Sequence, residues 1–164
     1  MNALVPREVF FTSGKGKADE ELLSFEMALR EAGIERLNLV AVSSIFPPEA
    51  KVISKKEGLK KLEDGQITFC VLSRITTYER GVVSAAVGLA RSEDTKQYGY
   101  ISEYHGHVGL DEARQVAEDM AAYMLASLTD MGEDKVNDVR SVGASIQGDD
   151  EHWVTALAAA IFIL

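Results

Sequence analysis

The chain has 164 residues, of which 46% are hydrophobic, and a formal net charge of −9 at neutral pH. This length suits one domain with a continuous core over residues 1–164. The negative charge argues against nucleic acid and anionic membranes as partners, because like charges repel.

The composition also bears on location. The longest apolar run, residues 156–164, is too short to cross a bilayer, and no basic region followed by an apolar stretch marks a signal peptide at the N-terminus. The single cysteine, Cys70, cannot form an internal disulfide, and its apolar surroundings predict a buried core thiol. A cytoplasmic protein that is not bound to a membrane is expected.

The first third of the chain predicts two strands around one helix. Residues 8–13 are expected to form a strand that ends in a flexible loop at residues 14–17, whose spacing does not match a phosphate-binding P-loop. Asp19 is the expected N-cap of a helix that ends at Gly33. A second strand is predicted over residues 36–43.

The remaining elements follow in close order. A short exposed helix is predicted at residues 54–62, and the longest helix at 110–128, with its apolar side at Val116, Met120, Tyr123, Met124 and Leu128. Further strands are predicted at residues 67–75, 82–90 and 98–104, with a closing hairpin of 135–147 and 153–163. Neighbouring strands with only two substantial helices indicate an α+β fold.

The segment Val42-Ser43-Ser44-Ile45-Phe46-Pro47-Pro48 is the most informative part of the sequence. An apolar strand leads into Ser43 and Ser44, and two prolines then prevent further pairing. One interpretation is an ordinary exit from a strand. The other is self-cleavage: the Ser44 hydroxyl attacks the Ser43 carbonyl, the peptide bond becomes an ester, and β-elimination breaks the chain. Ser44 would then become an N-terminal pyruvoyl group, a cofactor made from the protein itself.

Three segments carry a family resemblance. Residues 24–51, together with Val83–Val87 and Gly99–Tyr104, resemble the pyruvoyl-dependent arginine decarboxylases. The resemblance implies a four-layer α/β/β/α sandwich of the pyruvoyl-dependent histidine/arginine decarboxylase type, assembled as a homotrimer or a dimer of trimers. It implies cleavage between Ser43 and Ser44, giving a β chain of residues 1–43 and an α chain of residues 44–164. The implied reaction converts L-arginine to agmatine and CO₂.

A carbonyl cofactor suits this reaction. Loss of CO₂ from an amino acid leaves electrons at Cα that no ordinary side chain can delocalise, whereas a conjugated carbonyl group can accept them. No convincing phosphate-binding loop for pyridoxal phosphate occurs in the sequence, which favours a pyruvoyl group derived from Ser44.

The resemblance also assigns roles to single residues. Glu103 matches the general acid that returns a proton to Cα, and the alternative is a glutamate facing solvent at a sheet edge. Asn38 matches a residue that polarises the Ser43 carbonyl during cleavage, and alternatively satisfies a strand edge. Glu26 matches the acidic residue that binds the substrate guanidinium, although the best-known family pattern has aspartate there. Another cationic amino acid therefore stays open as the substrate. Leu29, Leu37 and Ile45 would line the substrate pocket, or belong to the core.

Other chemistries are less favoured. Glu103, His105 and His107 alternate along a strand and could share one face, but Gly106 and Gly109 indicate that the strand breaks there, so no metal is expected. A serine hydrolase is disfavoured because no Gly-x-Ser-x-Gly motif is present. A non-catalytic trimeric binding module of the same fold is the main alternative to an enzyme.

Overall fold

The computed structural model describes residues 4–128 and 135–164. Within these residues the chain forms an α+β fold of two sheets and three helices. In chain order the elements are β1 (Glu8–Ala18), α1 (Glu21–Ala32), β2 (Asn38–Ala41), β3 (Ile45–Phe46), β4 (Lys51–Val52), α2 (Lys55–Leu59), β5 (Ile67–Thr77), β6 (Gly81–Ser92), β7 (Gly99–Gly106), α3 (Leu110–Ala126), β8 (Val136–Gly148) and β9 (Trp153–Ile163).

The two sheets are built from strands that are scattered along the chain. The five-stranded sheet has the order β2-β5-β9-β1-β4, and the four-stranded sheet has the order β3-β7-β6-β8. The longest ladder of the first sheet is antiparallel and pairs β1 with β9 from Glu8↔Ile163 to Ala18↔Trp153. In the second sheet β6 lies between β7 and β8, and both pairings are antiparallel.

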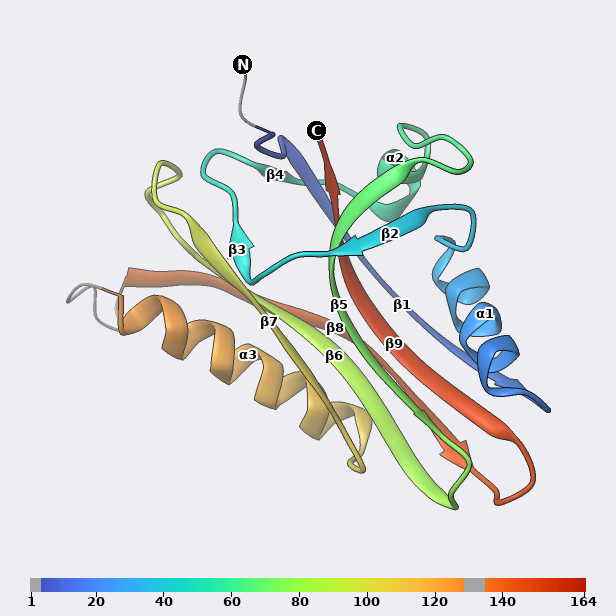
Figure 1. Cartoon of the computed structure of the whole chain (residues 1–164). Helices are drawn as coiled ribbons and strands as arrows, with labels where there is room; N and C mark the ends of the chain where they lie inside the picture. The colour runs from blue at the N-terminus through green and yellow to red at the C-terminus, as the bar shows by residue number, and fades with distance from the viewer. Residues whose placement is uncertain (1–3, 129–134) are drawn as a thin grey trace.

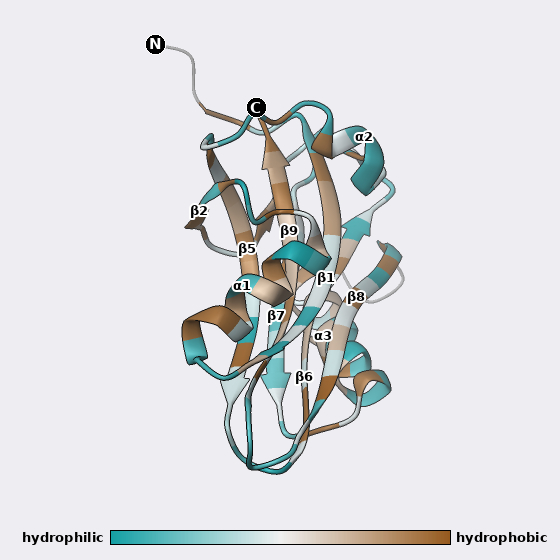
Figure 2. Cartoon of the chain, turned by 90° about the vertical axis from the view of Figure 1, so that its right-hand side faces the viewer, coloured by the Kyte–Doolittle hydropathy of each residue, from teal (hydrophilic) through white to brown (hydrophobic). Residues whose placement is uncertain are grey.

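Helices cover the outer faces of the two sheets. Helix α1 packs against β1 and β9, whereas α3 packs against β6, β7 and β8 (Figure 1). A core of side chains from both sheets, including Val71, Ala160, Val87 and Ile101, fills the space between them. Figure 2 shows the matching hydropathy pattern, with β9 hydrophobic along most of its length. Burial of β9 on both faces explains why its sequence is apolar apart from Thr155.

The predicted loop at residues 14–17 is wrong, because β1 continues through these residues to Ala18. Gly14 and Gly16 lie directly under α1, where a Cβ atom would overlap the carbonyl oxygen of Ala28 or of Ser24. These glycines therefore allow the helix backbone to approach the strand, and they do not mark a turn.

The predicted closing hairpin is also wrong. Strand β8 pairs with β6 in the four-stranded sheet, and β9 pairs with β5 and β1 in the other sheet. The turn at residues 149–152 therefore carries the chain from one sheet to the other. Alternation of side chains shows which face of a strand is buried, but it does not identify the partner strand.

The helices differ from the prediction in their details. The N-cap of α1 is Glu20, not Asp19, and its side chain makes no capping hydrogen bond. Helix α2 is shorter than predicted and begins with a capping box between Ser54 and Glu57. The buried face of α3 consists of small residues at every fourth position and one leucine, whereas Tyr123 is 73% exposed. The buried residues are Ala113, Ala117, Ala121 and Leu125.

Candidate active site

The Ser43-Ser44 dyad lies where the chain passes from one sheet to the other. Before it, the Val42 N–H donates to the carbonyl of Cys70 on β5, at 2.9 Å. After it, the Ile101 N–H on β7 donates to the Ser44 carbonyl at 2.7 Å, and β3 continues this pairing. Figure 1 shows the connection crossing from β2 to β3. The two hydrogen bonds fix the backbone on both sides of the peptide bond that joins the serines.

This geometry fits a prosthetic group made from Ser44. The side chain of Ser44 is partly buried, and its carbonyl group is held by β7 on the side away from the predicted cleavage point. A break before Ser44 would therefore leave residue 44 attached to the four-stranded sheet through Ile101, and a group formed there would stay in place.

Glu103 lies two residues beyond Ile101 on β7. Because side chains alternate along a strand, Glu103 shares the face of Ile101 that is turned toward the five-stranded sheet. The opposite face is identified by Ser102, whose hydroxyl donates to the Ala117 carbonyl of α3. The Glu103 side chain is exposed in the single chain, so this chain alone does not bury the carboxylate.

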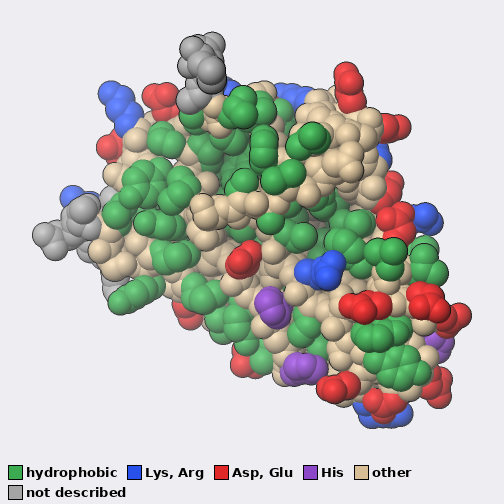
Figure 3. All heavy atoms as spheres, in the orientation of Figure 1, with side chains coloured by type: hydrophobic (Ala, Val, Ile, Leu, Met, Phe, Trp, Pro, Cys, Tyr) green, Lys and Arg blue, Asp and Glu red, His purple; other side chains and the backbone are tan. Residues whose placement is uncertain are grey.

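An apolar hollow of about 540 Å³ opens beside Ser43. Figure 3 shows hydrophobic side chains gathered on the upper part of this face of the molecule. Ile45, which was predicted to line the substrate pocket, lies in this hollow and is 41% exposed. The hollow is lined by Leu4, Val5, Pro6, Val42, Ser43, Ile45, Pro47, Pro48, Phe69 and Phe162.

Glu26, Leu29 and Leu37 lie in another part of the chain. Leu29 and Leu37 pack in the core between α1 and the five-stranded sheet. Glu26 on α1 accepts a hydrogen bond from the Arg30 guanidinium at 2.8 Å. The four-stranded sheet, which carries Ser44 and Glu103, covers the opposite face of the five-stranded sheet. These three predicted substrate residues are therefore separated from the dyad within one chain, whereas Ile45 lies next to it.

Asn38 stands at the start of β2, and its side-chain amide donates to the Gly65 carbonyl at 2.7 Å. This contact corresponds to the strand-edge alternative for Asn38. The structure does not bring the amide to the Ser43 carbonyl, which lies beyond the other end of β2.

Cys70 is fully buried, as the sequence predicted. Burial raises the pKa of its thiol to about 11, and the negative charge of Glu103 contributes to this rise. The thiol is therefore neutral at physiological pH and poorly suited to act as a nucleophile. The contribution of this residue to the site is its backbone carbonyl, which binds Val42.

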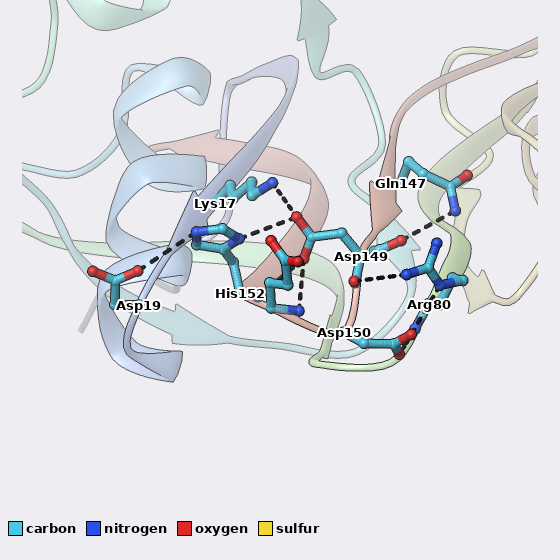
Figure 4. Close-up of polar contacts among 9 residues, drawn as sticks. Lys17, Asp19, Arg80, Gln147, Asp149, Asp150 and His152 are labelled. Atoms are coloured by element: carbon cyan, nitrogen blue, oxygen red, sulfur yellow. Dashed lines mark hydrogen bonds and ion pairs between the residues drawn. The ribbon is translucent and has the colours of Figure 1, made fainter.

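Among the described residues, one group of possible metal ligands is close enough to hold a single ion. It consists of Asp149, Glu151 and His152, whose ligand atoms lie within 4.8 Å of one another. Figure 4 shows Lys17 and His152 directed toward the Asp149 carboxylate. This ion pair with Lys17 already compensates the charge of Asp149 and stabilises the turn. His105 and His107 are both exposed and lie outside this group.

Two residues that contact candidate site residues or their backbone were missed from the sequence. Arg30 follows Glu26 by one helical turn, and this spacing alone could have revealed the pair. Ser73 is a polar residue within the apolar strand β5, and its hydroxyl binds the backbone next to Glu103. A buried serine in such a strand indicates a specific hydrogen bond, but not its partner.

Comparison with known proteins identifies one family for nearly the whole chain. Residues 8–164 match the family model described as pyruvoyl-dependent arginine decarboxylase. A protein of Archaeoglobus fulgidus named pyruvoyl-dependent arginine decarboxylase 1 is 43% identical over 162 residues, covering 98% of this chain and 100% of the relative. A second A. fulgidus protein, named pyruvoyl-dependent arginine decarboxylase 2, is 47% identical, with 99% of each chain covered. The pyruvoyl-dependent arginine decarboxylase of Thermoplasma volcanium is 42% identical, with 100% of each chain covered.

These matches define the class of the protein as a pyruvoyl-dependent decarboxylase. The chain belongs to the pyruvoyl-dependent arginine decarboxylase family, which confirms the resemblance inferred from residues 24–51 and the two later segments. Among the helices of the described residues, none has both the length and the apolar character that a membrane span requires.

Proposed function

We propose that the protein decarboxylates L-arginine to agmatine and CO₂ with a pyruvoyl group derived from Ser44. The observation that carries this proposal is the position of the dyad, between a hydrogen bond to β5 and a hydrogen bond to β7, in a chain of this family. The proposal includes self-cleavage into fragments of residues 1–43 and 44–164.

Cleavage uses atoms of the chain and one water molecule. The Ser44 Oγ attacks the Ser43 carbonyl carbon, and the acyl group moves from the Ser44 nitrogen to Oγ. Removal of the Ser44 Cα proton then expels the Ser43 carboxylate and leaves a dehydroalanine at residue 44. Water replaces its nitrogen, ammonia leaves, and a ketone remains. The hydrogen bonds of Val42 and Ser44 support this path because they hold the backbone while the bond between the serines changes.

After cleavage, the pyruvoyl group, Glu103 and Glu26 would have different roles in the reaction. The pyruvoyl group supplies the conjugated carbonyl that accepts the electrons left by CO₂. We assign to Glu103 the proton that returns to Cα, since its strand also holds Ser44. We assign to Glu26 the substrate guanidinium, because its carboxylate already binds the guanidinium of Arg30.

A complete site then requires two subunits. Glu26 and Ser44 lie on opposite sides of the five-stranded sheet, so residues of two chains must meet if they bind one substrate. A homotrimer, or a dimer of trimers, would provide such interfaces. The contacts of α1 and α3 with the outer faces of the sheets support a four-layer α/β/β/α sandwich. A cytoplasmic location fits the single buried thiol.

An intact-mass measurement combined with a decarboxylase assay tests the proposal. Wild-type protein should yield two fragments, the larger with a blocked N-terminus that reacts with carbonyl reagents, and should release CO₂ from arginine. Ser44→Ala should remain a single inactive chain. Glu103→Gln should be cleaved but lose activity by about 10²-fold, the usual contribution of a general acid. An uncleaved wild-type chain that does not react with carbonyl reagents would refute the proposal.

The same assay compares substrates. Glu26 is one methylene longer than the aspartate of the best-known family pattern and shortens the space left for the substrate. Lysine and ornithine should therefore be tested beside arginine. If kcat/KM for lysine or ornithine is higher than for arginine, that amino acid, and not arginine, is the preferred substrate.

A further inference from the structure

Ser73 links the two sheets next to Glu103. Its hydroxyl donates to the Tyr104 carbonyl on β7 at 2.6 Å, although Ser73 itself belongs to β5 in the other sheet. The residue is only 2% exposed. Val71, two positions earlier, and Ala158, the β9 partner of Ser73, both lie in the apolar core between the sheets.

Packing does not explain a hydroxyl at this position. A serine in an apolar core gains little over alanine unless its hydroxyl is satisfied, and here the partner is a single backbone carbonyl. That carbonyl belongs to the residue directly after Glu103. The hydrogen bond therefore holds the backbone next to the proposed general acid from the side of the five-stranded sheet, in addition to the ladder with β6.

Strand β5 also binds the backbone just before the Ser43-Ser44 dyad. The Cys70 carbonyl binds Val42 just before the dyad, and Ser73 follows Cys70 by three residues on the same strand. On the side of β7 facing β3, pairing covers only Tyr100 and Gly99, with one further hydrogen bond from Ile101. Ser73 therefore adds a contact between β5, which binds Val42 before the dyad, and β7 at the residue next to Glu103, while Ile101 on β7 binds Ser44 directly.

We propose that Ser73 is a positioning residue, which sets the place of Glu103 relative to residue 44 through its hydrogen bond to Tyr104. This inference rests on the proposed role of Glu103. It predicts that loss of the hydroxyl impairs proton return while self-cleavage, which depends on the Val42 and Ser44 contacts, proceeds normally.

The test compares Ser73→Ala with Ser84→Ala. Ser84 is equally buried and its hydroxyl also donates to a backbone carbonyl, that of Val108, at 2.7 Å on the α3 side of the four-stranded sheet. Both variants should show similar falls in Tm and complete cleavage by mass spectrometry. Only Ser73→Ala should lower kcat, by about tenfold, with KM for arginine unchanged, because small misplacements of a catalytic group cost rate. Ser73→Thr, which keeps the hydroxyl, should restore most of kcat.

Hydrogen exchange gives a readout that does not depend on activity. Deuterium uptake should rise in residues 99–106 of Ser73→Ala, whereas Ser84→Ala should show its rise in residues 107–110. If Ser73→Ala gives no folded protein, Ser73→Cys takes its place, since a thiol is a weak donor of similar size.

Equal kcat values for the two alanine variants, or equal uptake in residues 99–106, would overturn the inference. Loss of cleavage in Ser73→Ala alone would also overturn it, because the residue would then act on the dyad. Full activity of Glu103→Gln would instead refute the proposed role of Glu103, so the two failures can be distinguished.

Discussion

At the scale of single residues, Glu26 already binds a guanidinium group. Arg30 occupies its carboxylate through Nε, one helical turn away, and 59% of the Arg30 side chain is exposed. An arginine substrate that binds both carboxylate oxygens of Glu26 would have to displace Arg30, which binds Oε1. Arg30 then acts as an internal competitor that weakens substrate binding.

Arg30→Gln should lower KM for arginine about twofold with kcat unchanged, because an exposed i,i+4 ion pair contributes only about 0.5 kcal/mol. Steady-state kinetics measure this effect, and Arg80→Gln, which removes the distant ion pair with Asp150, serves as the matched control. The decrease should vanish in a Glu26→Gln background. An unchanged or higher KM in Arg30→Gln would contradict the competition.

Asp138 contributes a pH-dependent link between β6 and β8. Hydrogen bonds from Arg140 and Arg91 hold the pKa of its carboxyl below the ordinary value of 3.8. Protonation of Asp138 therefore favours the unfolded chain. The ionised carboxylate stabilises the fold fully above about pH 4, and this stabilisation is lost as the pH falls through the lower pKa of the folded state.

Asp138→Asn should consequently be less stable than wild type at pH 6, with a difference that shrinks toward pH 3. Urea unfolding at several pH values measures the free energy of unfolding of both proteins. A difference that stays constant down to pH 3 would show that the ionised carboxylate is not responsible.

At the scale of elements, β1 depends on close contact with α1. Gly14→Ala should destabilise the protein by about 1–3 kcal/mol, because the new methyl group meets the Ala28 carbonyl, which is backbone and cannot rotate away. Gly109→Ala, where no atom lies within 4 Å of an added Cβ, should cost less than about 1 kcal/mol. Thermal unfolding of both variants provides the comparison, and equal losses would contradict it.

The same element shows what the sequence could reveal. Strands such as β5, β6 and β9 were predictable because apolar and β-branched residues mark a buried strand locally. The continuation of β1 through Gly14 was not predictable. Gly14 is needed there because α1 packs closely on the strand, and this contact is between segments distant in the sequence. For the same reason, the alanine face of α3 escaped a search for large apolar residues.

The candidate site was predictable to a similar degree. The strand and prolines around Ser43 and Ser44 predicted a reactive segment, and hydrogen bonds of Val42 and Ser44 hold the backbone on both sides of this dyad. The separation of Glu26 from Ser44 depends on which face of a sheet each element covers, and sequence spacing does not contain this information.

At the scale of the whole molecule, that separation has a direct test. Co-expression of Ser44→Ala with Glu26→Gln should raise activity well above that of either variant alone, to about one quarter of wild type, if each site takes Glu26 and Ser44 from different chains that mix at random. Co-expression of Ser44→Ala with Glu103→Gln should restore nothing, because those residues lie on one side of the same chain. Restoration in the second mixture as well, or in neither, would contradict a shared site.

The strand order of the five-stranded sheet has a consequence for a cleaved chain. Residues 1–43 contribute β1 and β2, while residues 44–164 contribute β5, β9 and β4, so β1 is inserted between two strands of the other fragment. Once the covalent link is lost, the protein must reassemble from two molecules. Its recovery from urea should follow second-order kinetics, with a half-time about tenfold longer after tenfold dilution. The Ser44→Ala precursor, measured by circular dichroism under the same conditions, should regain its sheets at a rate independent of dilution.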